Sequence, residues 1–326
     1  MLFPECGVAA RNPTPLLFCP RGRYNLRMTT LHAWLDSRLP KMLPSAAVWL
    51  RDACIRQRGN YDQPKFLADF AVASRHSGKA LLTRGDARSW LAVDPAFNPS
   101  TWTADEAARI LLLLTVADAY PAKIFDCVTA CIQYSDQHEV MALLKALPWL
   151  PEPRRFLQFA QDACRSNQVN VFTAIACENP YPPRYFAAHT MNHLVVKALF
   201  LLVPLRRIIG IDSTADADRA RMALDWVEER EAAGRPFPTD LWRIVAPSAV
   251  ARALPALQRY ARHASPGQRM GVALALGLRK DAAARELLTA MSVGEQDATV
   301  LEVVRAVQSG VMPWEKLDGL RLETVK

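Results

Sequence analysis

The sequence predicts an all-α protein built from stacked helical hairpins, an α-α superhelix of the HEAT-like solenoid type. Three observations predict it. From residue 28 onward, apolar residues recur at helical spacing, as Leu31, Leu35 and Leu39 do. Prolines divide the chain into short segments, many of them apolar on more than one side. No alternating strand pattern flanks an Asn-Gly or Asp-Gly turn, so a sheet has no support.

The expected helices have explicit boundary signals. Thr103 and Glu106 form a capping box, because the hydroxyl and the carboxylate can each satisfy a free backbone amide at a helix start. Gly234, just before Pro236, is a signal for a helix end. After two segments around 31–39 and 66–73, helices are expected over residues 107–119, 121–131, 139–147, 153–165, 169–177, 183–203, 216–233, 249–263, 266–278, 280–291 and 296–309.

The domain organisation follows from composition along the chain. Residues 1–27 mix prolines with arginines without a helical period, so they are predicted to be a flexible leader, or a mis-assigned start with translation beginning at Met28. Residues 28–235 are predicted to be the main helical domain. Residues 236–326 are predicted to be a C-terminal helical extension that ends in a loosely docked tail from Met312.

Composition limits the function classes. The sequence contains no G-x-G, no P-loop and no G-x-S-x-G, which removes the dinucleotide, P-loop and serine-hydrolase signatures. The net charge of +8, from 40 basic and 32 acidic residues, is mild for a chain of 326 residues and is weak support for nucleic acid as a partner. Seven scattered cysteines without C-x-x-C predict buried free thiols in a reducing compartment, hence a cytoplasmic location.

One segment combines a proline-rich start with a polar stripe. Asn179-Pro-Tyr-Pro182 predicts a stiff, extended entry, because a residue before proline is disfavoured in the helical region. On the helix that follows, the polar residues share one side of an otherwise apolar surface, which places them either at a solvated edge or in a ligand-lined groove. These residues are His189, Asn192, His193 and Lys197.

His189 and His193 have the i,i+4 spacing of two zinc ligands on one helix. Thr190 stands where the H-E-x-x-H motif requires glutamate, and no third ligand is evident. We therefore predict no metal site and no cofactor.

A second polar segment lies further along the chain. Arg221, Asp225, Glu229 and Arg230 are close on one predicted helix, as an exposed ion-pair ladder or as a partly buried network that presents an arginine to an anion. Arg207 belongs to a basic corner just before Gly210.

Residues 178–242 contain an ordered series of short stretches: Asn179-Pro-Tyr-Pro, Tyr185-Phe186, Asn192, Leu194-Val-Val-Lys-Ala-Leu-Phe200, Arg207-Ile208, Gly210, Ala220-Arg221-Met222, Asp225, Glu229-Arg230, Ala233-Gly234-Arg235, Pro238 and Asp240-Leu241-Trp242. In their order and spacing they resemble the conserved block of the EboA-type metabolite-traffic family. His193 occupies a place where the family is expected to have glutamine.

The resemblance implies a helical-repeat protein that is encoded beside a UbiA-like prenyltransferase, in a gene set for making or moving secondary metabolites. We expect a non-enzymatic protein that binds or scaffolds a hydrophobic, prenylated or aromatic metabolite and its partners, with possible peripheral membrane contact. A lyase-like enzyme or a basic nucleic-acid-binding protein are the alternatives, and no catalytic residue is predicted. The predicted ligand-binding residues are Asn179, Tyr181, Tyr185, Asn192, His193, Lys197, Arg207, Arg221, Asp225 and Arg230.

Overall fold

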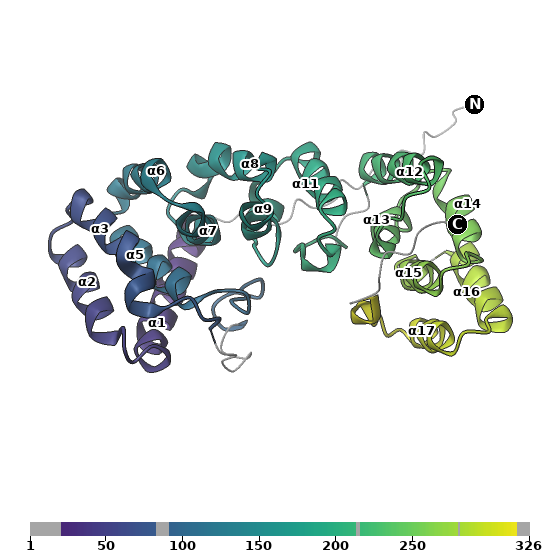
Figure 1. Ribbon diagram of the computed structural model, residues 1–326, viewed down its shortest axis with the longest axis horizontal. Coiled ribbons are helices and arrows are strands. Elements are labelled where there is room, and N and C mark those ends of the chain that lie inside the picture. The colour runs from purple at the N-terminus through teal and green to yellow at the C-terminus, as the bar shows by residue number, and fades with distance from the viewer. Residues whose placement is uncertain (1–20, 83–90, 213–215, 280, 318–326) are drawn as a thin grey trace, which may run out of the picture.

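The computed structural model describes residues 21–82, 91–212, 216–279 and 281–317, with side chains from Arg27 onward. The predicted all-α class is confirmed: in this part of the chain the secondary structure is helical, apart from an isolated antiparallel bridge between Leu81 and Thr103. The helices follow one another along the long axis of the molecule, from the first helix at one end to the last at the other (Figure 1).

The N-terminal helices surround one buried helix. They are α1 (Arg21–Met42), α2 (Ala47–Gly59), α3 (Gln63–Ser77), α5 (Ala104–Ala119), α6 (Ile124–Tyr134) and α7 (Gln137–Ala146). Every residue of α5 from Ala104 to Ala117 is buried, because α1, α2, α3 and α7 all pack against it. A helix enclosed in this way is apolar nearly all round, and its few charged residues must find partners inside the protein.

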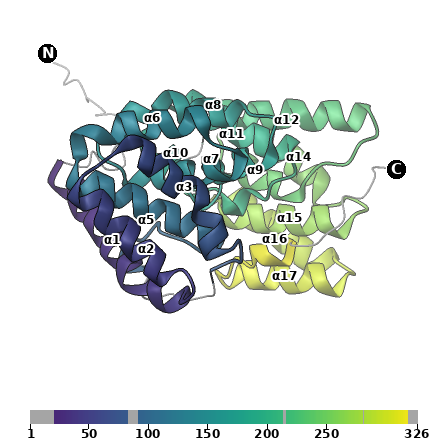
Figure 2. The ribbon, with the colours of Figure 1, turned by 60° about the vertical axis from the view of Figure 1, so that its left-hand side comes forward.

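The stack continues through the middle of the chain into the C-terminal third. The further helices are α8 (Leu157–Arg165), α9 (Val169–Ala176), α10 (Tyr181–Tyr185), α11 (Ala188–Phe200), α12 (Ala217–Ala232), α13 (Trp242–Val245), α14 (Ala253–Tyr260), α15 (Pro266–Gly277), α16 (Ala282–Gly294) and α17 (Ala298–Gln308). One row runs α5–α7–α9 and another α13–α15–α17, and α8, α12, α14 and α16 pack beside these rows (Figures 1 and 2). This is the pairwise stacking that the sequence predicts.

The expected helix over 183–203 is wrong in its extent. It is two helices, α10 and α11, separated by Phe186 and Ala187, which have extended backbone. The extended entry is wrong as well, because α10 already begins at Tyr181. Prolines are compatible with the first turn of a helix, where the missing N–H has no intrahelical acceptor to lose.

Both ends of the described chain differ from expectation. Helix α1 begins at Arg21, whereas no helical period is evident before Met28; residues 1–20 of the predicted leader lie outside the described residues. At the other end, Trp314 is only 8% exposed and packs under the Arg243 guanidinium, 4.6 Å from the ring centroid. The loosely docked tail is therefore wrong for residues 312–317, and residues 318–326 lie outside the described part.

Candidate functional site

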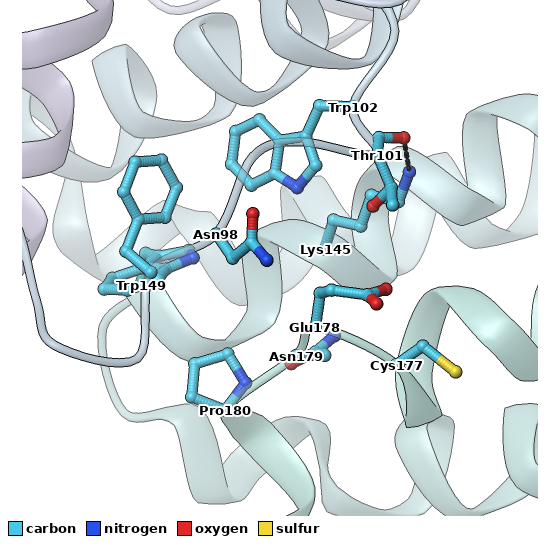
Figure 3. Close-up of a pocket in the computed structure, with 10 residues that line it drawn as sticks. Asn98, Thr101, Trp102, Lys145, Trp149, Cys177, Glu178, Asn179 and Pro180 are labelled. Carbon is cyan, nitrogen blue, oxygen red and sulfur yellow. Dashed lines mark hydrogen bonds between the residues drawn. The ribbon is translucent and has the colours of Figure 1, made fainter. Parts of the chain in front are cut away.

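A narrow recess lies where the N-terminal stack meets the segment before α10. It is lined by Phe97, Asn98, Thr101, Trp102, Lys145, Trp149, Cys177, Glu178, Asn179 and Pro180 (Figure 3). The space free of protein atoms at this recess, part of it open solvent, is about 270 Å³, and only about 10 Å³ admits the centre of a water molecule. That is room for roughly one water, whereas pockets for whole small molecules reach ~300–1,000 Å³. The recess therefore accommodates a group of about the size of one water molecule.

Aromatic rings form one side of the recess. The Phe97 ring meets the Trp102 and Trp149 rings edge to face, each at a centroid distance of 5.4 Å. Trp34 of α1 packs on Phe97 in the same way at 5.5 Å. Edge-to-face contacts align the positive rim of one ring with the negative face of another, so the wall is stabilised beyond its burial.

Two hydrogen-bond donors in the recess are free. Within the described residues, neither the Asn98 Nδ2 amide nor the Trp102 Nε1 indole donates to another protein group; Asn98 Oδ1 accepts from the Ser100 backbone amide at 3.0 Å. The Asn98 amide lies in the middle of Figure 3, with the Trp102 ring above it and residues 178–180 below it. Aromatic walls with a few unused donors are typical of sites that receive a ligand oxygen.

Lys145 lies on the polar side of the recess, where it forms an ion pair with Glu106. Its Nζ donates to Glu106 Oε2 at 2.6 Å and to the Thr101 carbonyl at 3.2 Å. Glu106 Oε2 also accepts from the Thr103 backbone amide at 2.8 Å, which is the glutamate half of the predicted capping box. Glu106 therefore connects the start of α5 to Lys145 and so to the recess.

Glu178 lies at the recess in a strained backbone conformation, with φ at +48°. Its carboxylate accepts two hydrogen bonds from Arg207, from Nε and from Nη2, both at 2.9 Å, and its backbone amide donates to the Arg207 carbonyl at 2.8 Å. The hydrogen bond to Glu178 raises the pKa of Arg207. This paired contact maintains a left-handed residue that costs about 1–3 kcal/mol.

Asn179 joins three elements beneath the recess. Its Nδ2 donates to the Leu144 carbonyl at 3.0 Å and to the Ala174 carbonyl at 2.9 Å, and its Oδ1 accepts from the Tyr181 amide at 2.9 Å. These bonds use both amide hydrogens and one acceptor of a side chain that is 3% exposed. Asn179 is thus the predicted ligand-binding residue that lines the recess, and it holds α7, α9 and α10 together.

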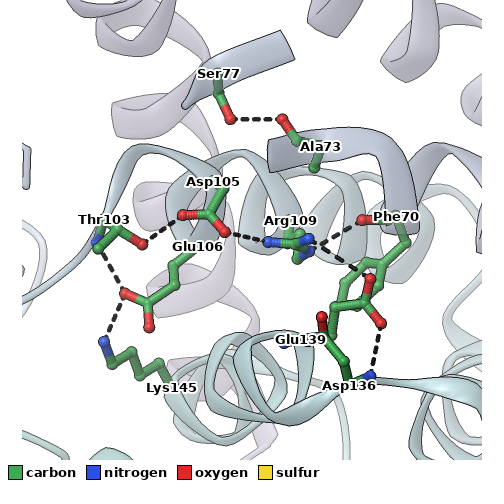
Figure 4. A network of polar contacts seen from close by, with 10 residues as sticks. All are labelled: Phe70, Ala73, Ser77, Thr103, Asp105, Glu106, Arg109, Asp136, Glu139 and Lys145. Carbon is green, nitrogen blue, oxygen red and sulfur yellow. Dashed lines mark hydrogen bonds and ion pairs between the residues drawn. The ribbon is translucent and has the colours of Figure 1, made fainter. Parts of the chain in front are cut away.

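A buried network of charges is linked to Lys145 of the recess through Thr103 and Glu106 (Figure 4). Arg109 of α5, which is 2% exposed, donates from Nη1 to Asp105 at 2.5 Å and from Nε to the Phe70 carbonyl at 3.0 Å. Its Nη2 lies 3.6 Å from Glu139 Oε1 on α7. The network satisfies charges that burial would otherwise make very costly, and it ties α3, α5 and α7 together.

Another buried carboxylate, that of Asp94, anchors the segment that leads into Phe97 and Asn98 of the recess. Asp94, 3% exposed, accepts from Arg184 Nη2 of α10 at 2.7 Å and lies 3.0 Å from Arg27 Nε of α1. The Arg184 guanidinium also lies over the Trp149 ring, 5.8 Å from its centroid. Asp94 therefore connects this segment to both α1 and α10.

The predicted polar stripe of α11 does not enter this recess. Asn192 is buried and bridges α12, donating to Asp216 Oδ1 and accepting from Arg219 Nε, both at 2.9 Å. Lys197 donates to the carbonyls of Cys164 and Ser166 at 2.8 and 2.7 Å, and burial lowers its pKa. These bonds connect α11 to α12 and to the end of α8.

The two histidines and the two tyrosines occupy different environments. His189 and His193 are exposed, and no group of three metal-ligating side chains occurs in the described part of the chain. Tyr181 is fully buried, burial raises its pKa, and its hydroxyl donates to the Pro153 carbonyl at 2.6 Å. The half-buried Tyr185 ring packs on Tyr181 at 4.8 Å.

On α12, the polar segment is exposed at Arg221 and Asp225, and neither residue pairs with the other. Arg221 pairs with Asp218 one turn earlier, and Asp225 accepts from Arg252, which directly precedes α14, at 2.6 Å. Arg230 donates twice to the Pro236 carbonyl, at 3.0 and 2.7 Å, and so closes the turn after the helix. The sequence could not choose among these partners, because several carboxylates lie within one turn of each arginine.

The described cysteines are buried and free. Cys177, at the recess, and Cys164 both have their thiol pKa raised to about 12, chiefly by burial. Because the thiolate is the reactive form, neither thiol is activated as a nucleophile.

Sequence reasoning missed Phe97, Trp149, Lys145 and the Arg109 network. A signal was present: α5 carries Arg109 inside a run of aliphatic residues, and a charge in an enclosed helix requires a buried partner.

The fold and the recess together define a helical-repeat protein with a small aromatic-walled site. A family model described as metabolite traffic protein EboA matches residues 27–246, about two-thirds of the chain, and the chain belongs to this EboA family. The matched range contains every residue of the recess. Neither a curated protein nor a solved structure matches the chain. In the described part of the chain, no helix combines the length and the apolar character that a membrane span needs.

Proposed function

We propose that this protein acts in metabolite traffic without catalysing a reaction, by binding a hydrophobic, aromatic or prenylated metabolite at the recess and holding it near its pathway partners. Membership of the EboA family supports the traffic role. The observation that carries the binding role is the pair of free donors, Asn98 Nδ2 and Trp102 Nε1, within aromatic walls. Such a site recognises a ring that bears a carbonyl, hydroxyl or ether oxygen.

The polar groups around the recess support binding over catalysis. Lys145 and Glu178, the ionisable residues most suited to acid–base chemistry there, are each held in an ion pair, with Glu106 and Arg207 respectively. Burial keeps the Cys177 thiol protonated. The recess thus offers hydrogen-bond donors and ring faces, while its charged groups hold the surrounding helices together.

The size of the recess sets how a ligand would bind. Space for about one water admits one polar substituent, so the ring that carries it and the rest of the metabolite would remain outside the recess. The exposed part would be accessible to a second protein. We propose pathway proteins, including a UbiA-like prenyltransferase, as those partners. The ligand-binding roles predicted for residues outside the recess stay predictions.

The test blocks the recess and leaves the rest of the protein unchanged. Asn98→Phe removes one of the two donors and sets a ring that is too large for the recess against it, whereas Ser100→Phe adds the same ring at an exposed position two residues along the same segment. Small molecules that co-purify with each protein from its native cells are measured by mass spectrometry. We expect one compound to accompany the wild type and Ser100→Phe, and to fall at least tenfold with Asn98→Phe. Equal amounts in all three proteins would contradict the recess as the site.

A further inference from the structure

A buried histidine lies where three of the N-terminal helices meet, away from the residues that line the recess. His32 of α1 is 7% exposed, in the region where α1, α2 and α5 pack against one another (Figure 1). Its Nε2 lies 3.3 Å from Nη2 of Arg58 on α2 and 3.2 Å from Oγ1 of Thr115 on α5. One ring nitrogen of His32 therefore connects three helices.

The contact with Arg58 fixes where the imidazole carries its proton. A guanidinium only donates hydrogen bonds, so the Nε2 atom that faces Arg58 is an acceptor and the proton of the neutral ring is on Nδ1. A second proton, placed on Nε2, would remove that acceptor and set one positive charge beside another. The neutral ring and the charged ring of His32 therefore cannot keep the same partner.

Thr115 offers the charged ring a different partner. Its hydroxyl donates to the Leu111 carbonyl at 2.8 Å, so lone pairs of Oγ1 remain for a donor. The buried Cys54 thiol is a further neighbour of this hydroxyl, with 3.5 Å between Sγ and Oγ1. A protonated Nε2 of His32 can therefore donate to Thr115, while the exposed Arg58 side chain turns to water.

The surroundings of His32 favour the neutral ring near pH 7. Burial lowers the pKa of His32, and the Arg58 charge lowers it further. Asp36 on α1 and Asp118 on α5 act in the opposite direction, but both are exposed and screened by solvent. Burial raises the pKa of the Cys54 thiol, so no thiolate is present to stabilise an imidazolium. The ring therefore takes up its second proton only below the usual value of 6.5.

We propose that His32 is a proton-operated switch between two helix contacts. With the ring neutral, Nε2 accepts from Arg58 and joins α1 to α2; with the ring protonated, Nε2 donates to Thr115 on α5 and Arg58 is released. Because burial disfavours the charged ring, acidification also weakens the packing of α1 on its neighbours. Helix α1 carries Trp34, whose ring packs on Phe97 of the recess at 5.5 Å, so this loosening reaches the aromatic wall. The switch does not depend on a ligand in the recess and is tested without one.

The first test is an NMR titration of the histidine rings in the full chain, with the His32 signal assigned by its loss in His32→Gln. We expect this signal to titrate below pH 6.5. Arg58→Met removes the facing cation and should raise the midpoint, whereas Arg51→Met, which removes another exposed arginine of α2, should leave it unchanged. A wild-type midpoint at or above 6.5, or the same midpoint in both arginine variants, would overturn the proposal.

The second test compares the equilibrium constant for folding at about pH 7.5 and about pH 5.5 by chemical denaturation. A group whose pKa is lower in the folded state contributes stability above its unfolded value, and that stability is lost as the pH falls through the folded value. For His32 we expect a roughly three- to tenfold fall in the wild type over this range. His32→Gln keeps an acceptor for Arg58 and does not titrate, so it should change less than twofold. Equal falls in both proteins would contradict the switch.

Hydrogen exchange then shows where the protein loosens. The amides of α1, corrected for the intrinsic effect of pH, should exchange faster at the lower pH in the wild type but not in His32→Gln. The amides of α17, at the other end of the described chain, are the internal control and should behave alike in both proteins. Unchanged protection of α1 in the wild type, or an equal loss of protection in α17, would overturn the proposed effect of His32 on α1.

Discussion

Two arginines in this molecule each form ion pairs with two carboxylates. One arginine is buried among the N-terminal helices, and the other lies on the surface. Arg109 contacts Asp105 and Glu139, and its side chain is 2% exposed. Arg252 contacts Asp225 and Glu228, and its side chain is 45% exposed. The chemistry is the same, but water solvates one set and is excluded from the other. The buried set must remain complete, whereas the exposed set can lose a member to solvent.

The largest effect is expected where the buried set is broken. Arg109→Met should lower the free energy of unfolding by about 3–5 kcal/mol, because Asp105 and Glu139 would be left as uncompensated buried acids. Chemical denaturation checks this. Adding Asp105→Leu to Arg109→Met should recover part of the loss by removing one of those acids. A loss below about 1 kcal/mol for Arg109→Met would show that the network is solvated.

The C-terminal helices include a close backbone contact at Gly271 of α15. A Cβ added to Gly271 of α15 would lie 2.5 Å from the Thr239 carbonyl oxygen, which is backbone and cannot rotate away. Gly271→Ala should therefore cost about 1–3 kcal/mol, although alanine favours helices.

Gly294→Ala is the matched control, because a Cβ added at Gly294 meets no atom within 4 Å. Both variants are compared by thermal unfolding, and only Gly271→Ala should unfold at a lower temperature. If both unfold alike, α15 and the turn at Thr239 are not in close contact.

The fold could be predicted from the sequence more completely than the candidate site. Helix starts such as Thr103 and helix ends such as Gly234 are local signals, and the residues that carry them are adjacent in sequence. The aromatic wall is not local: Phe97 meets Trp149 from more than fifty positions away. Helical periodicity states which face of a helix is buried but not which distant ring it meets. The stripe on α11 shows this: its pattern predicts a solvated edge or a ligand-lined groove, whereas Asn192 bonds to Asp216 and Arg219 and Lys197 bonds to carbonyls at the end of α8.

The smallest effect is expected at the exposed arginine. Arg252→Met removes contacts to Asp225 and Glu228 that water can replace, so unfolding by denaturant should show no measurable change, even though those carboxylates raise the pKa of Arg252. The same substitution, arginine to methionine, is thus made once inside and once outside. A large loss of unfolding free energy for Arg252→Met would mean that its ion pairs hold α12 to the start of α14. Solvent exposure would then not explain the difference between the ion pairs of Arg252 and those of Arg109.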